Sequence, residues 1–137
     1  MTTINATKGE FVNLINGLFQ VQELKGKKFG LVVSKNITIL KEDLKQLEDL
    51  GKPSEEFMEL ATKVNQISQE NPENAKEVID KLEKENEVLV KARREQLAKV
   101  TELMKDKIDI KLNTISEESL PEEITAQQIN NIERIIT

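Results

Sequence analysis

The first group of side chains that is suited to bind another molecule is a cluster of lysines near residue 26. Lys25, Lys27 and Lys28 surround Gly26 in a short basic turn, and Lys35 follows in the next predicted element. Lysines and backbone N–H groups at the start of a helix suit anions, so this turn can contact a phosphate or an acidic surface. The phosphate-binding spacing GxxxxGK[ST] is absent. The alternative is a basic turn that simply lies in solvent.

A second cationic segment, Arg93 and Arg94 after Lys91, can dock an acidic partner. The alternative is a solvated helix face of mixed charge, on which pairs such as Glu87 with Lys91 bind one another. Arg93 and Asn86 also fall near an apolar stripe. A polar group on a coiled-coil seam can fix register and oligomeric state, although a straight helix that drifts against the heptad would place both at the edge.

Other chemistry is restricted by two missing residue types, cysteine and histidine. Without cysteine there are no disulfides, thiolate zinc sites or cysteine nucleophiles. Without histidine the chain lacks the commonest general base and transition-metal ligand. The carboxylate pairs Glu117-Glu118 and Glu122-Glu123 follow no EF-hand pattern and are typical of solvated acidic runs. We therefore expect no enzyme, no catalytic residue, no cofactor and no metal.

Composition indicates one domain of long two-faced helices. The chain has 137 residues, of which 33% are charged and only 3% aromatic. Residues 1–52 hold eight lysines against six acidic residues, residues 53–106 nine basic against thirteen acidic, and residues 107–137 three against six. This acidic excess argues against duplex nucleic acid as a partner. Apolar runs are far shorter than the roughly 20 residues that span a bilayer, and the N-terminus lacks a signal-peptide pattern. We expect no membrane partner and a cytoplasmic location.

The first half of the chain predicts a strand and two helices. Residues 2–6 tolerate a strand. Thr7 and Glu10 form a capping-box pattern that opens a helix over 8–23, which Gly17 weakens. A second helix over about 28–50 carries a heptad seam, which serves as core or as a groove for a partner helix. A hairpin turning at residues 34–36 is the competing prediction for residues 28–40. The seam residues are Phe29, Val33, Ile37, Leu40, Leu44 and Leu47.

The second half predicts long helices, a strand and a terminal helix. Ser54 opens one helix, and Asn71 with Pro72 caps another that runs to about residue 105. A helix of more than 30 residues is about 50 Å long and must pack along another helix or another subunit, so we expect a homo-oligomer. Residues 107–112 alternate as a strand whose only good partner is residues 2–6. Residues 120–124 are expected to be extended, and a capping box at Thr125 opens the last helix.

These elements define a mainly α fold. We predict an elongated helical hairpin or small bundle with a short two-stranded antiparallel β element and a C-terminal helix. The single domain spans residues 1–137, with a strand at 1–6, first helices at 8–50, a long return helix at 53–105, and a strand and terminal helix at 107–137.

Two stretches resemble a group of small uncharacterised helical proteins that tailed bacteriophages and prophages encode. The resemblance implies a phage origin and the order of helical hairpin, strand and terminal helix, and it brings no site residues. The stretches cover about half of the chain. They are Gly26-Lys27-Lys28-Phe29 through Lys35-Asn36 with the Leu40/Leu44/Leu47 helix and Lys52-Pro53-Ser54-Glu55-Glu56-Phe57, and Ile108-Asp109-Ile110-Lys111-Leu112 to Leu120-Pro121-Glu122-Glu123-Ile124-Thr125.

The sequence and the resemblance together favour a non-enzymatic binding protein. The first hypothesis is a phage inhibitor that occupies the surface of a bacterial host factor, such as a defence or transcription component, in the host cytoplasm. The alternatives are a virion structural or assembly component, and a sponge for a small anionic nucleotide signal. The candidate partner contacts are Lys25, Lys27, Lys28, Lys35, Arg93 and Arg94.

Overall fold

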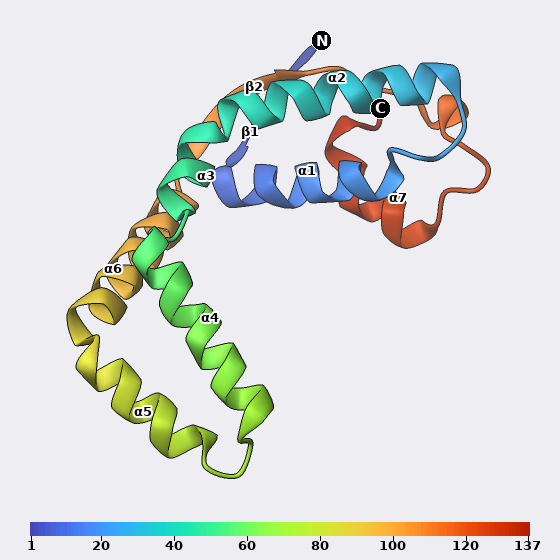
Figure 1. The fold of residues 1–137 in the computed structure, drawn as a ribbon. Coiled ribbons are helices and arrows are strands. Elements are labelled where there is room, and N and C mark those ends of the chain that lie inside the picture. The colour runs from blue at the N-terminus through green and yellow to red at the C-terminus, as the bar shows by residue number, and fades with distance from the viewer. The chain divides into compact units, whose positions relative to one another are not determined.

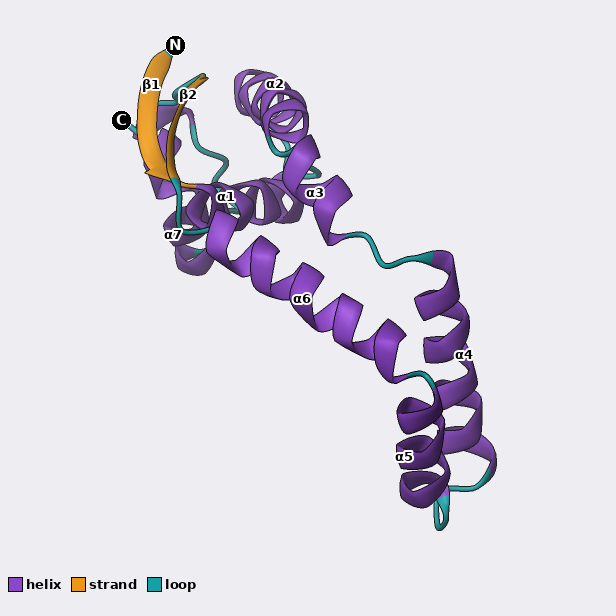
Figure 2. Ribbon diagram, turned by 90° about the vertical axis from the view of Figure 1, so that its left-hand side faces the viewer, coloured by secondary structure: helices purple, strands orange, loops and turns teal.

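The computed structural model describes all 137 residues, which form two compact units (Figure 1). Unit 1 comprises residues 1–47 and 102–137, and unit 2 comprises residues 48–101. The fold is mainly helical with one two-stranded antiparallel sheet, as the sequence predicts (Figure 2). It contains seven α-helices. No helix combines the length and apolar character that crossing a membrane requires. In chain order the elements are β1 (Thr2–Thr7), α1 (Lys8–Val21), α2 (Lys27–Asp43), α3 (Lys45–Gly51), α4 (Glu55–Glu70), α5 (Ala75–Glu85), α6 (Glu87–Leu103), β2 (Lys107–Leu112), the 3₁₀ turn η1 (Glu117–Ser119), α7 (Ala126–Ile132) and the 3₁₀ turn η2 (Glu133–Ile135).

The sheet of unit 1 joins segments from opposite ends of the sequence. β1 and β2 are antiparallel, with Thr2 opposite Leu112 and Thr7 opposite Lys107. This register confirms the predicted pairing of the two segments. Ile110 and Leu112 are buried, whereas Lys111 between them is exposed, because successive side chains of a strand point to opposite faces. One face of the sheet therefore contributes to the core that stabilises a strand pair of this size.

Helix α1 follows the strand directly through the predicted capping box. The Thr7 hydroxyl accepts a hydrogen bond from the Glu10 N–H at 3.1 Å, and the Glu10 carboxylate accepts one from the Thr7 N–H at 3.1 Å. The helix ends at Val21, two residues before the predicted end. The connection to α2 contains Gly26 at a φ of +137°, a conformation that glycine adopts without steric cost.

Helix α2 settles the choice between helix and hairpin at residues 28–40 in favour of helix. The helix is unbroken from Lys27 to Asp43, through residues 34–36 where the hairpin would turn. The single helix predicted over 28–50 is wrong in one respect, since it divides at Leu44 into α2 and α3. Leu44 is buried despite the division, so the seam residues still belong to the core. The seam residues Phe29, Val33, Ile37, Leu40, Leu44 and Leu47 are all buried within unit 1.

Unit 2 corrects the prediction of one long return helix over residues 53–105. Three helices occupy this range: α4, which the Ser54 hydroxyl caps as predicted, then α5 and α6. Asn71 ends α4 instead of opening the next helix, because its N–H donates to the Ile67 carbonyl. Asn86 divides α5 from α6, and its side-chain amide donates to the Leu82 carbonyl at 2.8 Å. Such side-chain bonds to nearby backbone compete with regular helix, and neither resulting helix approaches 50 Å.

The C-terminal segment returns to the core of unit 1. Residues 120–124 are not extended as predicted; they form a turn in which the Ile124 N–H donates to the Pro121 carbonyl at 3.2 Å. The predicted capping box of Thr125 with Gln128 opens α7. After η2 the chain pairs with residue 115, where the Ile115 N–H donates to the Ile135 carbonyl at 2.8 Å. Buried isoleucines therefore anchor this segment in the core at both ends, Ile115 near its start and Ile132 and Ile135 near its end.

Candidate functional site

The predicted basic turn lies at the connection between α1 and α2 in unit 1. Lys25, Lys27 and Lys28 are exposed, and none takes part in an ion pair. The first turn of α2 holds no acidic residue, and its N-cap residue Gly26 has no side chain to accept from the helix. Positive charge at a helix N-terminus is unfavourable for the helix dipole, so these lysines gain nothing from α2. Lys35 is also exposed, two turns further along α2 from Lys28 and about 10 Å away along the axis.

The two predicted arginines lie on α6 and differ from each other. Arg93 is half-buried, and its guanidinium donates to the Gly51 carbonyl at 2.8 Å. It also lies over the Phe57 ring, 5.6 Å from the centroid, so it holds α6 to the segments at the start of unit 2. Its side chain thereby has a role within the chain. Arg94 is exposed and makes no such bond. The lysine turn belongs to unit 1 and the arginines to unit 2.

Arg94 lines a hollow of about 560 Å³ where α5 meets α6. Three acidic and three basic side chains surround it, with Val90 as the apolar contribution. The pair expected between Glu87 and Lys91 does not form, since the ion pair Lys52–Asp49 is the one present in unit 2. The charges at this hollow therefore remain free for another molecule. The lining residues are Asp80, Glu83, Lys84, Glu87, Val90, Lys91 and Arg94.

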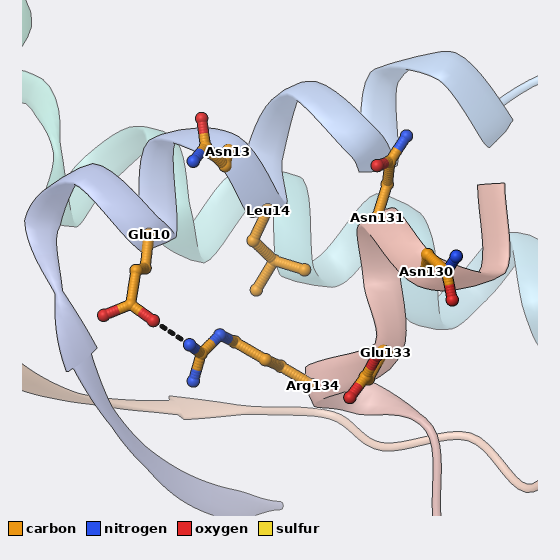
Figure 3. A pocket seen from close by; sticks show the side chains of 7 residues that line it. All are labelled: Glu10, Asn13, Leu14, Asn130, Asn131, Glu133 and Arg134. Atoms are coloured by element: carbon orange, nitrogen blue, oxygen red, sulfur yellow. Dashed lines mark hydrogen bonds and ion pairs between the residues drawn. The ribbon is translucent and has the colours of Figure 1, made fainter. Parts of the chain in front are cut away.

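A second hollow, of about 580 Å³, lies between α1 and α7 in unit 1 and was not predicted (Figure 3). Glu10 and Arg134 form an ion pair across one end of it (Figure 3). Asn131 donates to the Gln20 side chain at 3.2 Å near the other end. The polar groups here are amides, a neutralised ion pair and the carboxylate of Glu133, which suit hydrogen bonding and include no nucleophile beside a base. The lining residues are Glu10, Asn13, Leu14, Asn130, Asn131, Glu133 and Arg134.

The close approach of α1 to α7 depends on Gly17. A Cβ atom built at this position would lie 2.9 Å from the Asn131 Cβ and 3.0 Å from its carbonyl oxygen. The sequence interpretation of Gly17 as a weak point of the helix missed this requirement. The available signal was the glycine itself, because an isolated glycine within a helical pattern often marks a close packing contact.

Many apolar side chains of unit 2 are exposed to solvent. Of nineteen buried apolar residues, only Leu60 and Ala75 belong to unit 2. Helix α6 buries none of its 17 residues. The exposed large apolar side chains of unit 2 are Leu50, Met58, Val78, Val88 and Leu97.

No protein-family model matches this chain, and no curated protein or solved structure shows significant similarity to it.

Proposed function

We propose that this chain is a non-enzymatic binding protein that acts by occupying the surface of another macromolecule, and that it does so as a homo-oligomer. The observation that carries the proposal is the incomplete burial of unit 2. A segment of 54 residues with two buried apolar side chains gains little from its own core. Association that covers such surface stabilises the folded chain by mass action.

The partner in this proposal is a protein of a bacterial host, such as a defence or transcription component. The likeness of residues 26–57 and 108–125 to phage-encoded proteins favours a phage inhibitor that works in the host cytoplasm. The exposed lysines 25, 27, 28 and 35 give it a contact for an acidic surface. Because the lysines lack intramolecular partners, a docked carboxylate would not have to displace another.

The test combines capture from host lysate with purified components. The wild-type chain and a Lys25→Glu/Lys27→Glu/Lys28→Glu variant are immobilised, and proteins bound by the first but not by the second are identified. Direct binding is then measured by calorimetry with the purified candidate, at 0.05 M and 0.3 M salt. We expect affinity to fall with salt and the candidate's own activity to be lost on binding.

A matched control reverses three exposed lysines of unit 2, Lys63, Lys76 and Lys99, for the same change in net charge. Equal loss of binding in the control would mean that net charge, and not the basic turn, determines capture. Turnover of a small substrate by the purified chain would refute the non-enzymatic part of the proposal. Saturable binding of a nucleotide that the triple variant abolishes would identify a sponge for an anionic signal instead.

A further inference from the structure

Exposed charges follow one line along α5 and α6. Asp80, Glu83, Glu87, Lys91 and Arg94 succeed one another at steps of three or four residues, the spacing that places side chains on one helix face. All five are exposed, and none forms an ion pair within the chain. All five also line the hollow at the α5–α6 junction, so the line remains continuous past the division at Asn86.

The signs of these charges are segregated along the line. The first three residues are acidic and the last two are basic, with Lys84 beside the line near its centre. A copy of the same line turned end to end therefore presents opposite charge at every position except the central Glu87. In an antiparallel pair centred on Glu87, Asp80 faces Arg94, and Glu83 faces Lys91. Twofold symmetry repeats each contact, which is the property of an isologous interface.

The centre of such a pair is also compatible with association. The two Glu87 side chains would approach each other at the axis, but Lys84 and Lys91 lie one turn away on either side and come from both copies. Three acidic and three basic residues line the hollow, so the face as a whole is neutral and two copies do not repel.

Apolar surface adds to the charge pattern. Val90 lies within the hollow, Leu97 continues the line one turn beyond Arg94, and Val88 beside Glu87 is 85% exposed. Since α6 has no buried residue, nothing within the chain covers these side chains fully. A nucleic acid would meet the acidic half of the line, and an acidic or a basic peptide would each be repelled by one half. A second copy of this chain is the occupant that satisfies both halves.

We propose that two copies of this chain associate through antiparallel contact of their α5–α6 faces, with Asp80 and Glu83 of each copy bound to Arg94 and Lys91 of the other. This inference rests on the homo-oligomer part of the proposed function and names the surface responsible.

Charge reversal tests the pairing directly in the full chain. One variant carries Asp80→Lys and Glu83→Lys, and the other carries Lys91→Glu and Arg94→Glu. The first variant leaves Glu87 as the one acidic residue of the line, and the second makes the line uniformly acidic. In each, positions 80 and 94 and positions 83 and 91 of facing copies carry the same sign, so we expect the dimer dissociation constant to rise roughly a hundredfold, because like charges at close range are strongly unfavourable at an interface. Sedimentation velocity over 1–200 µM measures the constant, and circular dichroism verifies that helix content is retained.

Mixing the two variants distinguishes specific pairing from general damage. In the mixture, positions 80 and 83 of each variant face charges of opposite sign at positions 94 and 91 of the other, and the central Glu87 pair is unchanged. The mixture should therefore form a heterodimer about as tight as the wild-type dimer. The chain contains no cysteine, so Asp80→Cys mixed with Arg94→Cys provides an independent check, a disulfide between the two copies under mild oxidation. A matched control for the second variant, Lys81→Glu with Lys99→Glu, makes the same charge change one residue or more off the line and should leave the dimer unchanged.

The outcomes separate this inference from the proposed function. A dimer that survives both reversals, or variants that fail to pair on mixing, would overturn the α5–α6 interface while leaving oligomerisation and partner binding in place. A wild-type chain that is monomeric throughout the concentration range would overturn both the interface and the homo-oligomer part. Binding to the host protein is measured separately and does not depend on either result.

Discussion

The side chain of Asn36 is hydrogen-bonded to both backbone groups of Asn113. Its amide donates to the Asn113 carbonyl at 2.9 Å, and its oxygen accepts from the Asn113 N–H at 2.8 Å. Asn36 is fully buried on α2 and is the one buried polar residue of the chain. Asn113 directly follows β2, so this pair connects the middle of α2 to the end of the sheet. It also supplies partners to backbone groups that would otherwise lack them.

The first prediction concerns this pair. Asn36→Ala removes both hydrogen bonds and leaves a small cavity, and each bond contributes about 1 kcal/mol net, with more lost where a partner stays unsatisfied. We expect the free energy of unfolding to fall by about 2–4 kcal/mol in urea denaturation followed by far-UV circular dichroism. Asn113→Ala is the matched control, because it keeps the backbone groups and removes only a 3.3 Å contact between the two side chains. Equal losses in the two variants would contradict the assignment of stability to the backbone bonds.

The second prediction compares two helical glycines. Gly17→Ala places a Cβ 2.9 Å from Asn131, so α7 must shift away from α1, and we expect a loss of about 1–3 kcal/mol. Gly30→Ala on α2 meets no atom within 4 Å and should instead stabilise by about 0.5–1 kcal/mol. Both variants raise helix propensity equally, so opposite signs in thermal unfolding isolate the packing term. A stabilised Gly17→Ala protein would show that α7 does not pack closely on α1.

Patterns among residues close in sequence predicted much of this fold. The features that these patterns missed depend on contacts between residues far apart in sequence. The capping boxes at Thr7 and Thr125 depend on residues three apart, so the sequence is sufficient to predict them. The β1–β2 pairing was predictable because residues 107–112 had one available partner. By contrast, Asn36 binds a residue 77 positions away, and no helical pattern indicates that contact.

The candidate surfaces show the same difference between features that depend on nearby residues and features that depend on distant ones. The exposed lysines of the basic turn were visible as a charge cluster, and their exposure follows from charge alone. The role of Arg93 within the chain could not be predicted, because it requires the Gly51 carbonyl 42 residues away. The expected long helix is divided at Asn86 into α5 and α6, where the Asn86 side-chain amide donates to the Leu82 carbonyl of its own helix.

The third prediction concerns Glu10, whose carboxylate has two partners. One oxygen caps the Thr7 N–H, and the other pairs with Arg134. Glu10→Gln retains the cap and loses the charge, so unfolding free energy should fall by at most about 1 kcal/mol, because both groups of the pair are partly exposed. Glu10→Ala loses both and should cost about 1–2 kcal/mol. In 1 M NaCl the difference between wild type and Glu10→Gln should vanish while the effect of Glu10→Ala persists. A Glu10→Gln deficit that is independent of salt would show that the lost stabilisation does not come from the ion pair with Arg134.

The fourth prediction is that unit 1 folds without most of unit 2. Seventeen of the nineteen buried apolar residues belong to unit 1, so its core does not require residues 53–95. The ends of that segment are adjacent, because the Gln96 side chain donates to the Lys52 carbonyl at 2.5 Å and the Leu50 carbonyl at 2.6 Å. About six Gly and Ser residues span up to roughly 20 Å and can therefore join residues 52 and 96.

The shortened chain should retain a cooperative thermal transition by circular dichroism, with a melting temperature close to that of the full protein, and should sediment as a monomer. Unit 2 alone, residues 48–101, should show helix content that rises with concentration, because those helices gain burial mainly through a second copy. Loss of the cooperative transition in the shortened chain would mean that the 137 residues fold only as a single domain. A concentration-independent helix signal from residues 48–101 would show that unit 2 needs no partner to fold.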